Sequence, residues 1–398
     1  MTLANHAPDA RLETRLCRPG PKRLLALDGG GVRGLISLGY LSAIEALLRD
    51  RYRDPDYTLS DYFDLIGGTS TGSLIGTLLA LGWPVGEITN AYLELAERVF
   101  RPNHYWGLGP IGRALSDRFS AVPLEEILEQ FLGQTTLDSP RLRTGLLVVM
   151  KRIDTASVWP VVNIPGSRFF DDRPTGSGGL SVGNRHFLLR DILRAATAAP
   201  TFFRPKRIGD VGVLQPAVFV DGAISTHNNP ALMTLMAATL DGFGLRWILG
   251  PDQMLLCSVG TGHFSRTAPV ESVERFSNLD WAQLLLPQLI GDSMEFVESL
   301  LQWMSVSPTA RPIDRVIGTA EPKLNDGRGL LRFLRYNLSL TLAELDAIGV
   351  SLEARQMLAL RDMSNVNSIP HLLDVSRRVG SSVNAEHFSP GFDRPRAP

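Results

Sequence analysis

The first 81 residues contain two units with the same order of elements. Each unit has an apolar run, a turn with glycines and a helical pattern. In the first unit, residues 23–28 lead through glycines into apolar residues that recur with helical spacing over 35–48. In the second unit, residues 62–66 lead through glycines into a helical pattern over 73–81. Short apolar runs that end at glycines are typical of buried strands, and apolar spacings of three and four indicate helices. Strands and helices that alternate in this way predict a parallel sheet with helices on its faces.

The rest of the chain continues these patterns until about residue 271, where glycine turns thin out and helical patterning prevails. We therefore expect a three-layer α/β/α sandwich with a mainly parallel central sheet and a helical C-terminal extension. The expected strands are 145–153, 157–163, 217–220 and 254–259, the expected helices are 88–99, 124–132 and 187–199, and a surface loop is expected over 165–185. The expected boundaries are an N-terminal tail over 1–22, an α/β domain over 23–270, the extension packed on the core over 271–380 and a second tail over 381–398.

Composition excludes several classes of protein. With 40 Lys and Arg against 41 Asp and Glu, the chain lacks the basic surplus that a nucleic-acid polymer would favour. Two cysteines, Cys17 and Cys257, exclude a disulfide scaffold and a Cys-rich zinc module, and they suit a reducing compartment such as the cytoplasm. No apolar run approaches about 20 residues, and the start of the chain lacks the pattern of a secretory signal, so no membrane span or signal is expected. No acidic cluster resembles a calcium loop, so no metal is expected.

The pentapeptide Gly68-Thr-Ser-Thr-Gly72 has the pattern of a nucleophile elbow, in which a sharp turn between a strand and a helix lifts a serine hydroxyl out of the backbone. The glycines on both sides of Ser70 permit such a turn, and the positive end of the following helix favours developing negative charge. A second match, with Ser181 at its centre, lies in the glycine- and proline-rich loop, where no strand precedes it. The context therefore favours Ser70 and disfavours Ser181 as a nucleophile.

The segment Asp28-Gly29-Gly30-Gly31-Val32-Arg33-Gly34, which we name the glycine loop, follows the first expected strand. Its letters fit a dinucleotide-binding fingerprint, but that site also needs an acidic residue about 20 positions on, at the end of a second strand. Asp50 has this distance, yet it ends a helical pattern. Alternatively, the backbone N–H groups of Gly29, Gly30 and Gly31 form an oxyanion hole, or the glycines make a tight turn only. Arg33 then steadies an anionic head group or the turn itself.

A third stretch, Asp221-Gly222-Ala223, follows an apolar run with strand character. A carboxylate at a strand end can accept a proton from a serine, although Asp-Gly is also common in turns of no functional importance. A triad in the order Ser, Asp, His would need a histidine after Asp221, and His227, His263 and His371 are available. None of these three histidines lies in a distinctive motif.

In this order, the three motifs resemble those of the patatin-like phospholipases. Two further segments agree with the resemblance, which covers about residues 22–265: Ala195-Ala-Thr-Ala-Ala-Pro-Thr-Phe-Phe203 and Leu256-Cys-Ser-Val-Gly-Thr-Gly262. The resemblance implies a patatin-like catalytic domain that uses a Ser-Asp dyad without histidine or cofactor. Ser70 is then the nucleophile and Asp221 the general base, the Gly29–Gly31 backbone is the oxyanion hole, and the supporting motif residues are Arg33, Gly34, Gly68, Gly72, Gly222 and Ala223. Ala223 stands where many members of the family have glycine.

The function that the resemblance implies is that of a serine lipid acyl hydrolase of the phospholipase A type. It would cleave fatty-acyl esters of membrane phospholipids at the inner face of a membrane, with peripheral contact. Segments 100–115 (with Tyr105, Trp106 and Leu108), 281–289 and 296–304 are candidates for that contact, although aromatic anchors and apolar stripes also pack within ordinary folds. Alternatives are an acyltransferase or lysophospholipase of the same fold, and a phospholipase effector of bacterial anti-phage defence gated by a cyclic oligonucleotide, for which the sequence has no motif.

The dyad makes a physical demand on its aspartate. A free aspartic acid has a pKa of about 3.9 and is a weak base toward a serine hydroxyl. Burial must therefore raise the pKa of Asp221, or the proton must move only as the oxyanion forms.

Overall fold

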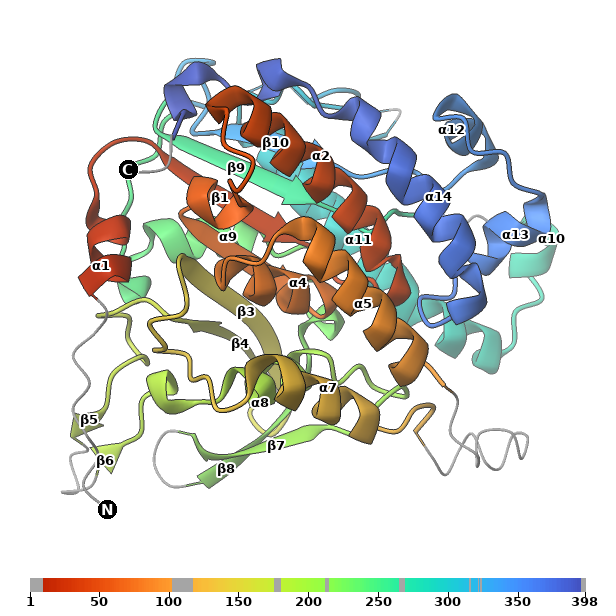
Figure 1. The fold of residues 1–398 in the computed structure, drawn as a ribbon. Coiled ribbons are helices and arrows are strands. Elements are labelled where there is room, and N and C mark those ends of the chain that lie inside the picture. The colour runs from red at the N-terminus through yellow and green to blue at the C-terminus, as the bar shows by residue number, and fades with distance from the viewer. Residues whose placement is uncertain are drawn as a thin grey trace.

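The computed structural model describes residues 10–101, 117–174, 180–211, 215–264, 269–314, 316–320, 322 and 324–394. One sheet of eight strands runs through the centre of this part of the chain, with helices on both of its faces (Figure 1). The strand order is β10-β9-β1-β2-β3-β8-β7, and β4 also pairs with β3. The strands are β1 (Lys22–Leu27), β2 (Leu65–Thr69), β3 (Gly145–Arg152), β4 (Ser157–Val162), β7 (Lys206–Val211), β8 (Gln215–Asp221), β9 (Met254–Val259) and β10 (Arg332–Tyr336).

The pairing of β1 with β2 decides where the site lies. The five strands from β10 to β3 are parallel, whereas β4, β7 and β8 run antiparallel to their neighbours. Leu27 at the end of β1 pairs with Gly68 near the end of β2. The glycine loop after β1 and the turn after β2 therefore leave the sheet at the same edge, where α/β proteins bind their ligands.

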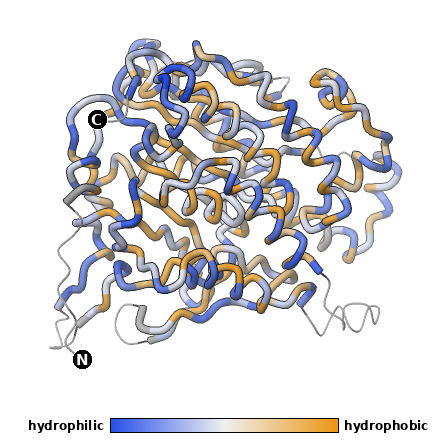
Figure 2. The backbone as a smooth tube through the Cα atoms, in the orientation of Figure 1, coloured by the Kyte–Doolittle hydropathy of each residue, from blue (hydrophilic) through white to orange (hydrophobic). Residues whose placement is uncertain are grey.

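Two apolar clusters make the fold three-layered. Along β1, Leu25 and Leu27 belong to one cluster, whereas Leu24 and Ala26 belong to the other. This alternation buries both faces of the strand, as expected in the middle of a parallel sheet. The first cluster lies under α2 (Gly34–Tyr52), α4 (Thr71–Ala80), α5 (Val85–Val99) and α14 (Ile369–Val379), and the second lies under α9 (Ala231–Thr239) and α11 (Asn278–Met304). Figure 2 shows hydrophobic residues along the central strands and many of the hydrophilic residues on the outer turns.

Smaller elements complete the described chain. The remaining helices are α1 (Ala10–Cys17), α3 (Leu59–Tyr62), α7 (Val122–Leu132), α8 (Leu189–Ala196), α10 (Val270–Val273), α12 (Leu342–Ala347) and α13 (Ala354–Ala359). A separate two-stranded ribbon, β5 (Arg173–Pro174) and β6 (Leu180–Ser181), lies within the expected loop 165–185.

The expected fold class is confirmed, but the second strand lies further along the chain than the expected 62–66. Tyr62 ends α3, and β2 begins only at Leu65. Among the described helices, one is long and apolar enough to cross a membrane: Gly31–Tyr52, which is α2 with the short turn before it. Most of this helix is buried in the fold, where α2 packs against α14. Burial identifies it as a core helix, because a spanning helix would present its apolar surface to lipid.

The N-terminal segment differs from the expected tail over 1–22. Within its described part, α1 buries Leu12 and Leu16 against the second cluster. Arg15 donates a hydrogen bond of 2.8 Å to the Phe63 carbonyl oxygen. The apolar pattern of α1 consists of these two leucines alone, which is too short to predict a helix from the sequence.

The extension over 271–380 contains the expected helices, among them α11 and α14, but it also contributes a strand. β10 pairs in parallel with β9, with Phe333 opposite Leu256. Since β10 has only five residues and lies far from its partner in the sequence, local periodicity could not reveal that it joins the sheet.

The expected tail over 381–398 is also wrong for its described part, residues 381–394. Phe388 and Phe392 are buried in the first cluster. Arg394 forms an ion pair with the buried carboxylate of Asp64. The C-terminal residues thus close the core beside the start of β1 and are part of the folded unit.

The buried C-terminal aromatic rings predict a large stability effect. Phe388→Ala removes a fully buried ring and leaves a cavity, so the free energy of unfolding should fall by about 3–5 kcal/mol. Phe296→Ala is the matched control, because Phe296 is 64% exposed and its loss should change stability by no more than about 0.5 kcal/mol. Urea denaturation of the two variants checks this, and equal losses in both would contradict the packing of the C-terminus.

Candidate active site

Ser70 lies in a strained turn between β2 and α4. Its backbone has φ 52° and ψ −126°, outside the conformations that residues other than glycine favour. The flanking glycines are required by close backbone contacts. A Cβ on Gly68 would lie 2.3 Å from the Gly72 carbonyl oxygen, and a Cβ on Gly72 would lie 2.1 Å from the Leu27 carbonyl oxygen. The turn therefore has the strand–turn–helix geometry that a nucleophile elbow needs, and it packs against the end of β1.

Asp221 ends β8 and lies beside the same turn. It pairs across the sheet with Met150, just past the point where β3 pairs with the last residue of β2. Its carboxylate accepts a hydrogen bond of 2.9 Å from the Ala223 amide. The Ser70 side chain is near enough to lower the pKa of this carboxylate, and both residues line the same cavity. The following Gly222 is also required, because a Cβ there would lie 2.5 Å from the Val149 carbonyl oxygen.

The environment of Asp221 changes its acidity. The residue is 1% exposed, and burial raises the pKa of its carboxyl to about 7, against the smaller opposing effects of the Ser70 side chain and the Ala223 amide. The group therefore exchanges its proton near neutral pH, as the dyad requires of its base.

The three glycines of the loop each face an atom that excludes a side chain. A Cβ would meet the Asn228 side-chain oxygen at Gly29, the Thr261 hydroxyl at Gly30 and the Met363 carbonyl oxygen at Gly31, each within 2.4 Å. Gly31 also has φ +56°. Close approach as well as turn geometry thus explains the three consecutive glycines.

The three glycine amides differ in whether they already donate a hydrogen bond within the protein. The Gly29 N–H donates to the Asn228 carbonyl oxygen at 3.1 Å. In the described part of the chain, no acceptor bonds to the amides of Gly30 and Gly31. Of the three amides that the sequence predicts for an oxyanion hole, the Gly29 amide is therefore already occupied, and those of Gly30 and Gly31 remain as candidates.

The rest of the glycine loop packs against the elbow. A Cβ on Gly34 would lie 2.4 Å from the Thr71 methyl group, so this glycine allows the loop to approach α4. The Arg33 guanidinium lies 5.4 Å from the centre of the Phe264 ring, and Arg361 lies at the same distance from that ring. Both arginines line the cavity that Ser70 faces.

That cavity has a volume of about 450 Å³ and is mostly apolar. It contains Ser70, Asp221, Gly30 and Gly31, and helices from both halves of the chain form its walls. The apolar walls include Leu74, Leu95, Val99, Leu124, Leu128, Leu193, Leu286, Ile290 and Met294. An apolar cavity with a few polar groups at one point suits a ligand with a long hydrocarbon part.

Several residues of the site had no signal in the sequence. Met363, in the C-terminal extension, lines the cavity and accepts the Val32 amide through its carbonyl oxygen at 2.7 Å. Tyr92 donates its hydroxyl to the Gly31 carbonyl oxygen. Such contacts join segments far apart in the chain, so no local sequence pattern could predict them. Thr261 lies within the stretch 256–262 that agrees with the family resemblance, and Asn228 directly follows the candidate His227.

Within the part of the chain that the structure describes, no hydrogen bond or ion pair joins His227, His263 or His371 to Ser70 or Asp221. His263 lines the cavity, but its ring bonds to the Ser339 hydroxyl at 3.0 Å, and burial lowers its pKa. Burial also lowers the pKa of His227, whose carbonyl oxygen accepts from Thr69. His371 lies on α14, far along the chain from the elbow.

The second pentapeptide and the dinucleotide fingerprint lack the geometry that their functions need. Ser181 lies in the ribbon of β5 and β6, where it pairs with Arg173 and does not line the cavity. Asp50 is exposed near the end of α2, so it is not the acidic strand end that a dinucleotide site requires. Among the described residues, no group of three or more His, Cys, Asp or Glu side chains could hold a metal ion.

Comparison with known proteins shows which family the chain resembles. The family profile described as patatin-like phospholipase matches residues 25–235. Patatin-17 of Solanum cardiophyllum is 27% identical over 349 residues, covering 81% of this chain and 78% of the relative. A cGAMP-activated phospholipase of Escherichia coli is 29% identical over 221 residues, covering 55% of this chain and 56% of the relative. The solved structure of human GIVD cytosolic phospholipase A2 aligns at 12% identity with a TM-score of 0.42, covering 93% of this chain and 60% of that one.

The fold and the family match define the class as a lipid hydrolase. This chain belongs to the patatin-like phospholipase family.

The buried carboxyl predicts a pH-dependent stability difference. Because the pKa of Asp221 is about 7 when folded and about 3.9 when unfolded, the protonated form favours the native state, and this contribution is lost as pH rises from about 4 to 7. The Asp221→Asn variant does not lose stability in this way, because asparagine does not titrate. Its stability relative to wild type should therefore rise by about 4 kcal/mol between pH 4 and pH 8.

Urea denaturation across that pH range measures the difference. Asp252→Asn, at an exposed aspartate, is the control and should differ from wild type by a constant amount. A constant difference for Asp221→Asn would contradict its raised pKa.

Proposed function

We propose that this chain is a serine phospholipase of the A type that cleaves fatty-acyl esters of membrane phospholipids through a dyad of Ser70 and Asp221. The observation that carries the proposal is that Ser70, in its strained turn, and the buried carboxylate of Asp221 line the same apolar cavity, with the Ser70 side chain near enough to lower the pKa of Asp221. The amides of Gly30 and Gly31 line the same cavity and supply the oxyanion hole.

In the first half of the reaction, the Ser70 oxygen attacks the ester carbonyl carbon while Asp221 accepts the serine proton. The carbonyl oxygen becomes an oxyanion, which the Gly30 and Gly31 amides stabilise. When the intermediate collapses, the bond to the leaving alcohol breaks, and Asp221 returns the proton to that alcohol. The fatty acyl group then remains on Ser70 as an ester.

In the second half, a water molecule attacks the acyl ester and gives its proton to Asp221. The bond to the Ser70 oxygen breaks, the serine recovers a proton from Asp221, and the fatty acid leaves. The raised pKa of Asp221 supports this role, because a carboxylate that titrates near 7 is a far better base than one that titrates near 4.

Contacts around the cavity support a phospholipid as the substrate. The apolar walls suit the acyl chain, and Arg33 beside the oxyanion amides suits the negative phosphate of the head group. On α11, Leu286 lines the cavity and is also exposed, as are Trp281, Leu285 and Leu289, which supports peripheral contact with a lipid surface. Of the expected contact loop, Phe100 also lines the cavity, while Tyr105, Trp106 and Leu108 lie outside the described residues.

We place this reaction in the cytoplasm, at the inner face of a membrane. Cys17 and Cys257 are both free thiols in the structure, which suits a reducing compartment. Fractionation of cells that express the chain, with detection of the soluble and membrane-associated pools, tests this placement.

Substitution of the dyad is the direct test of the proposed chemistry. Ser70→Ala and Asp221→Asn should each lower kcat for release of fatty acid from phospholipid vesicles by at least about 1,000-fold. Ser181→Ala is the matched control, because it removes the serine of the second pentapeptide and should keep wild-type activity. Full activity in Asp221→Asn would transfer the base role to another residue, with His263 the first to examine.

The raised pKa also predicts the pH profile of the reaction. Asp221 must be ionised to accept the serine proton, so kcat/KM should rise with pH through a single ionisation near 7 and then level off. Initial rates with a soluble short-chain ester between pH 5 and 9 measure this profile. A plateau that already begins near pH 5 would contradict a buried carboxylate as the base.

A second candidate is a phospholipase that is silent until a cyclic nucleotide binds. The observation that favours it is the similarity to the cGAMP-activated phospholipase of Escherichia coli. Fatty acid release measured with and without cGAMP separates the two candidates. Activity only after addition of the nucleotide supports the gated enzyme, and equal activity supports the constitutive one.

A further inference from the structure

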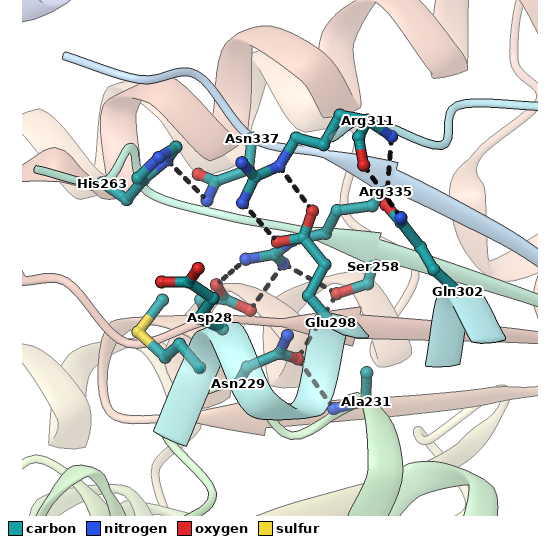
Figure 3. Close-up of polar contacts among 12 residues, drawn as sticks. Asp28, Asn229, Ala231, Ser258, His263, Glu298, Gln302, Arg311, Arg335 and Asn337 are labelled. Atoms are coloured by element: carbon teal, nitrogen blue, oxygen red, sulfur yellow. Dashed lines mark hydrogen bonds and ion pairs between the residues drawn. The ribbon is translucent and has the colours of Figure 1, made fainter. Parts of the chain in front are cut away.

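Four charged side chains form a cluster beneath the glycine loop (Figure 3). Asp28 comes from the loop itself, Glu298 from α11, Arg335 from β10, and Arg311 from the segment between these two elements. The side chains of Asp28, Glu298 and Arg335 are at most 2% exposed. Three of the four residues lie beyond the segment that matches the family profile, which ends at residue 235.

Arg335 holds the Asp28 carboxylate with both ends of its guanidinium. One terminal nitrogen donates to Asp28 Oδ1 at 3.0 Å, and the other donates to Asp28 Oδ2 at 2.6 Å. The first nitrogen also donates to the Ser258 hydroxyl at 2.8 Å. This two-point contact fixes the direction of the carboxylate as well as its charge.

Glu298 and Arg311 complete the balance of charge. Glu298 lies 3.5 Å from the Arg335 Nε atom, and Arg311 donates two hydrogen bonds to Glu298, at 2.6 and 3.0 Å. Two cations thus face two anions. A buried ion pair often adds little to stability compared with apolar groups of the same size, so stability alone is a weak reason for such a cluster.

Asp28, a member of the cluster, lies two positions before Gly30, the first of the two amides that the proposed reaction needs. The Asp28 amide donates to the Val259 carbonyl oxygen at 3.1 Å, and the Gly29 carbonyl oxygen accepts from the Thr261 hydroxyl at 3.0 Å. These bonds hold the backbone from β9 and the turn that follows it. The carboxylate of Asp28 is held by Arg335 from the next strand, β10.

We propose that Arg335 is a positioning residue of the active site. By clamping the Asp28 carboxylate from a strand near the C-terminus, it fixes the backbone that presents the Gly30 and Gly31 amides to the cavity. This inference rests on the proposed function for the role of those two amides. It makes the C-terminal half of the chain a part of the catalytic apparatus, although Arg335 itself touches no reacting atom.

The test compares Arg335→Met and Arg335→Lys with a matched control, Arg23→Met. Arg23 is also buried and paired with an aspartate, Asp64, but it lies at the opposite end of β1 from the glycine loop. Lysine keeps the charge of Arg335 but cannot make the two-point contact. Two readouts are taken on each full-length variant: hydrogen exchange of the amides over residues 28–34, followed by mass spectrometry, and kcat and KM with a soluble short-chain ester.

For Arg335→Met we expect faster exchange over residues 28–34 and a fall in kcat of about 100-fold, with KM within about twofold of wild type. Arg335→Lys should fall between wild type and Arg335→Met in both readouts. Arg23→Met should leave exchange of residues 28–34 and kcat unchanged, even if it lowers the midpoint of unfolding.

Unchanged exchange and unchanged kcat in folded Arg335→Met or Arg335→Lys would overturn the proposal. An equal effect of Arg23→Met on the glycine loop would also overturn it, because any lost buried pair would then suffice. If the wild type hydrolysed no ester, the proposed function would fail, and the exchange readout would still decide whether Arg335 fixes the loop.

Discussion

The parallel pairing of β1 with β2 is the constraint on which the rest of the site depends. Their register places the ends of both strands at one edge of the sheet, and Gly72 presses against the last residue of β1. Because no side chain fits between the two turns, the glycine loop and the elbow of Ser70 form one rigid unit. Asp221 joins it from β8, an antiparallel strand that ends beside the same edge. Backbone packing thus determines where the candidate site residues lie, and their side chains then determine its chemistry.

The catalytic half of this arrangement could be predicted from local patterns. Ser70 is distinguished by the apolar run before its pentapeptide and the apolar helix after it, whereas Ser181 lacks both. The glycines of the loop and of the turn at Ser70 are recognisable in the sequence because they directly follow apolar runs, where a tight turn excludes larger side chains. The fold class follows from the same alternation of strands and helices. The precise amides could not be predicted, since the engagement of Gly29 by Asn228 depends on a contact between residues about 200 positions apart.

The C-terminal half could not be predicted in the same way. β10 is short, and what makes it a strand is its partner β9 rather than its own periodicity. The segments expected to be terminal tails bury apolar side chains at isolated positions, such as Leu12, Phe388 and Phe392. Isolated positions have no helical or strand periodicity from which burial could be predicted. Arg335, Met363 and Arg361 reach the glycine loop or the cavity from this half. A segment beyond the family match thus contributes to the walls and the support of the candidate site.

The measurement that tests the central claim most directly is a crystal structure of the protein after reaction with a long-chain alkyl fluorophosphonate, which mimics the tetrahedral intermediate. We expect phosphorus bonded to the Ser70 oxygen, with the phosphoryl oxygen about 3 Å from the Gly30 and Gly31 nitrogens and the alkyl chain in the apolar cavity. Phosphorus on another residue, or a phosphoryl oxygen that points away from these two amides, would contradict the proposed chemistry.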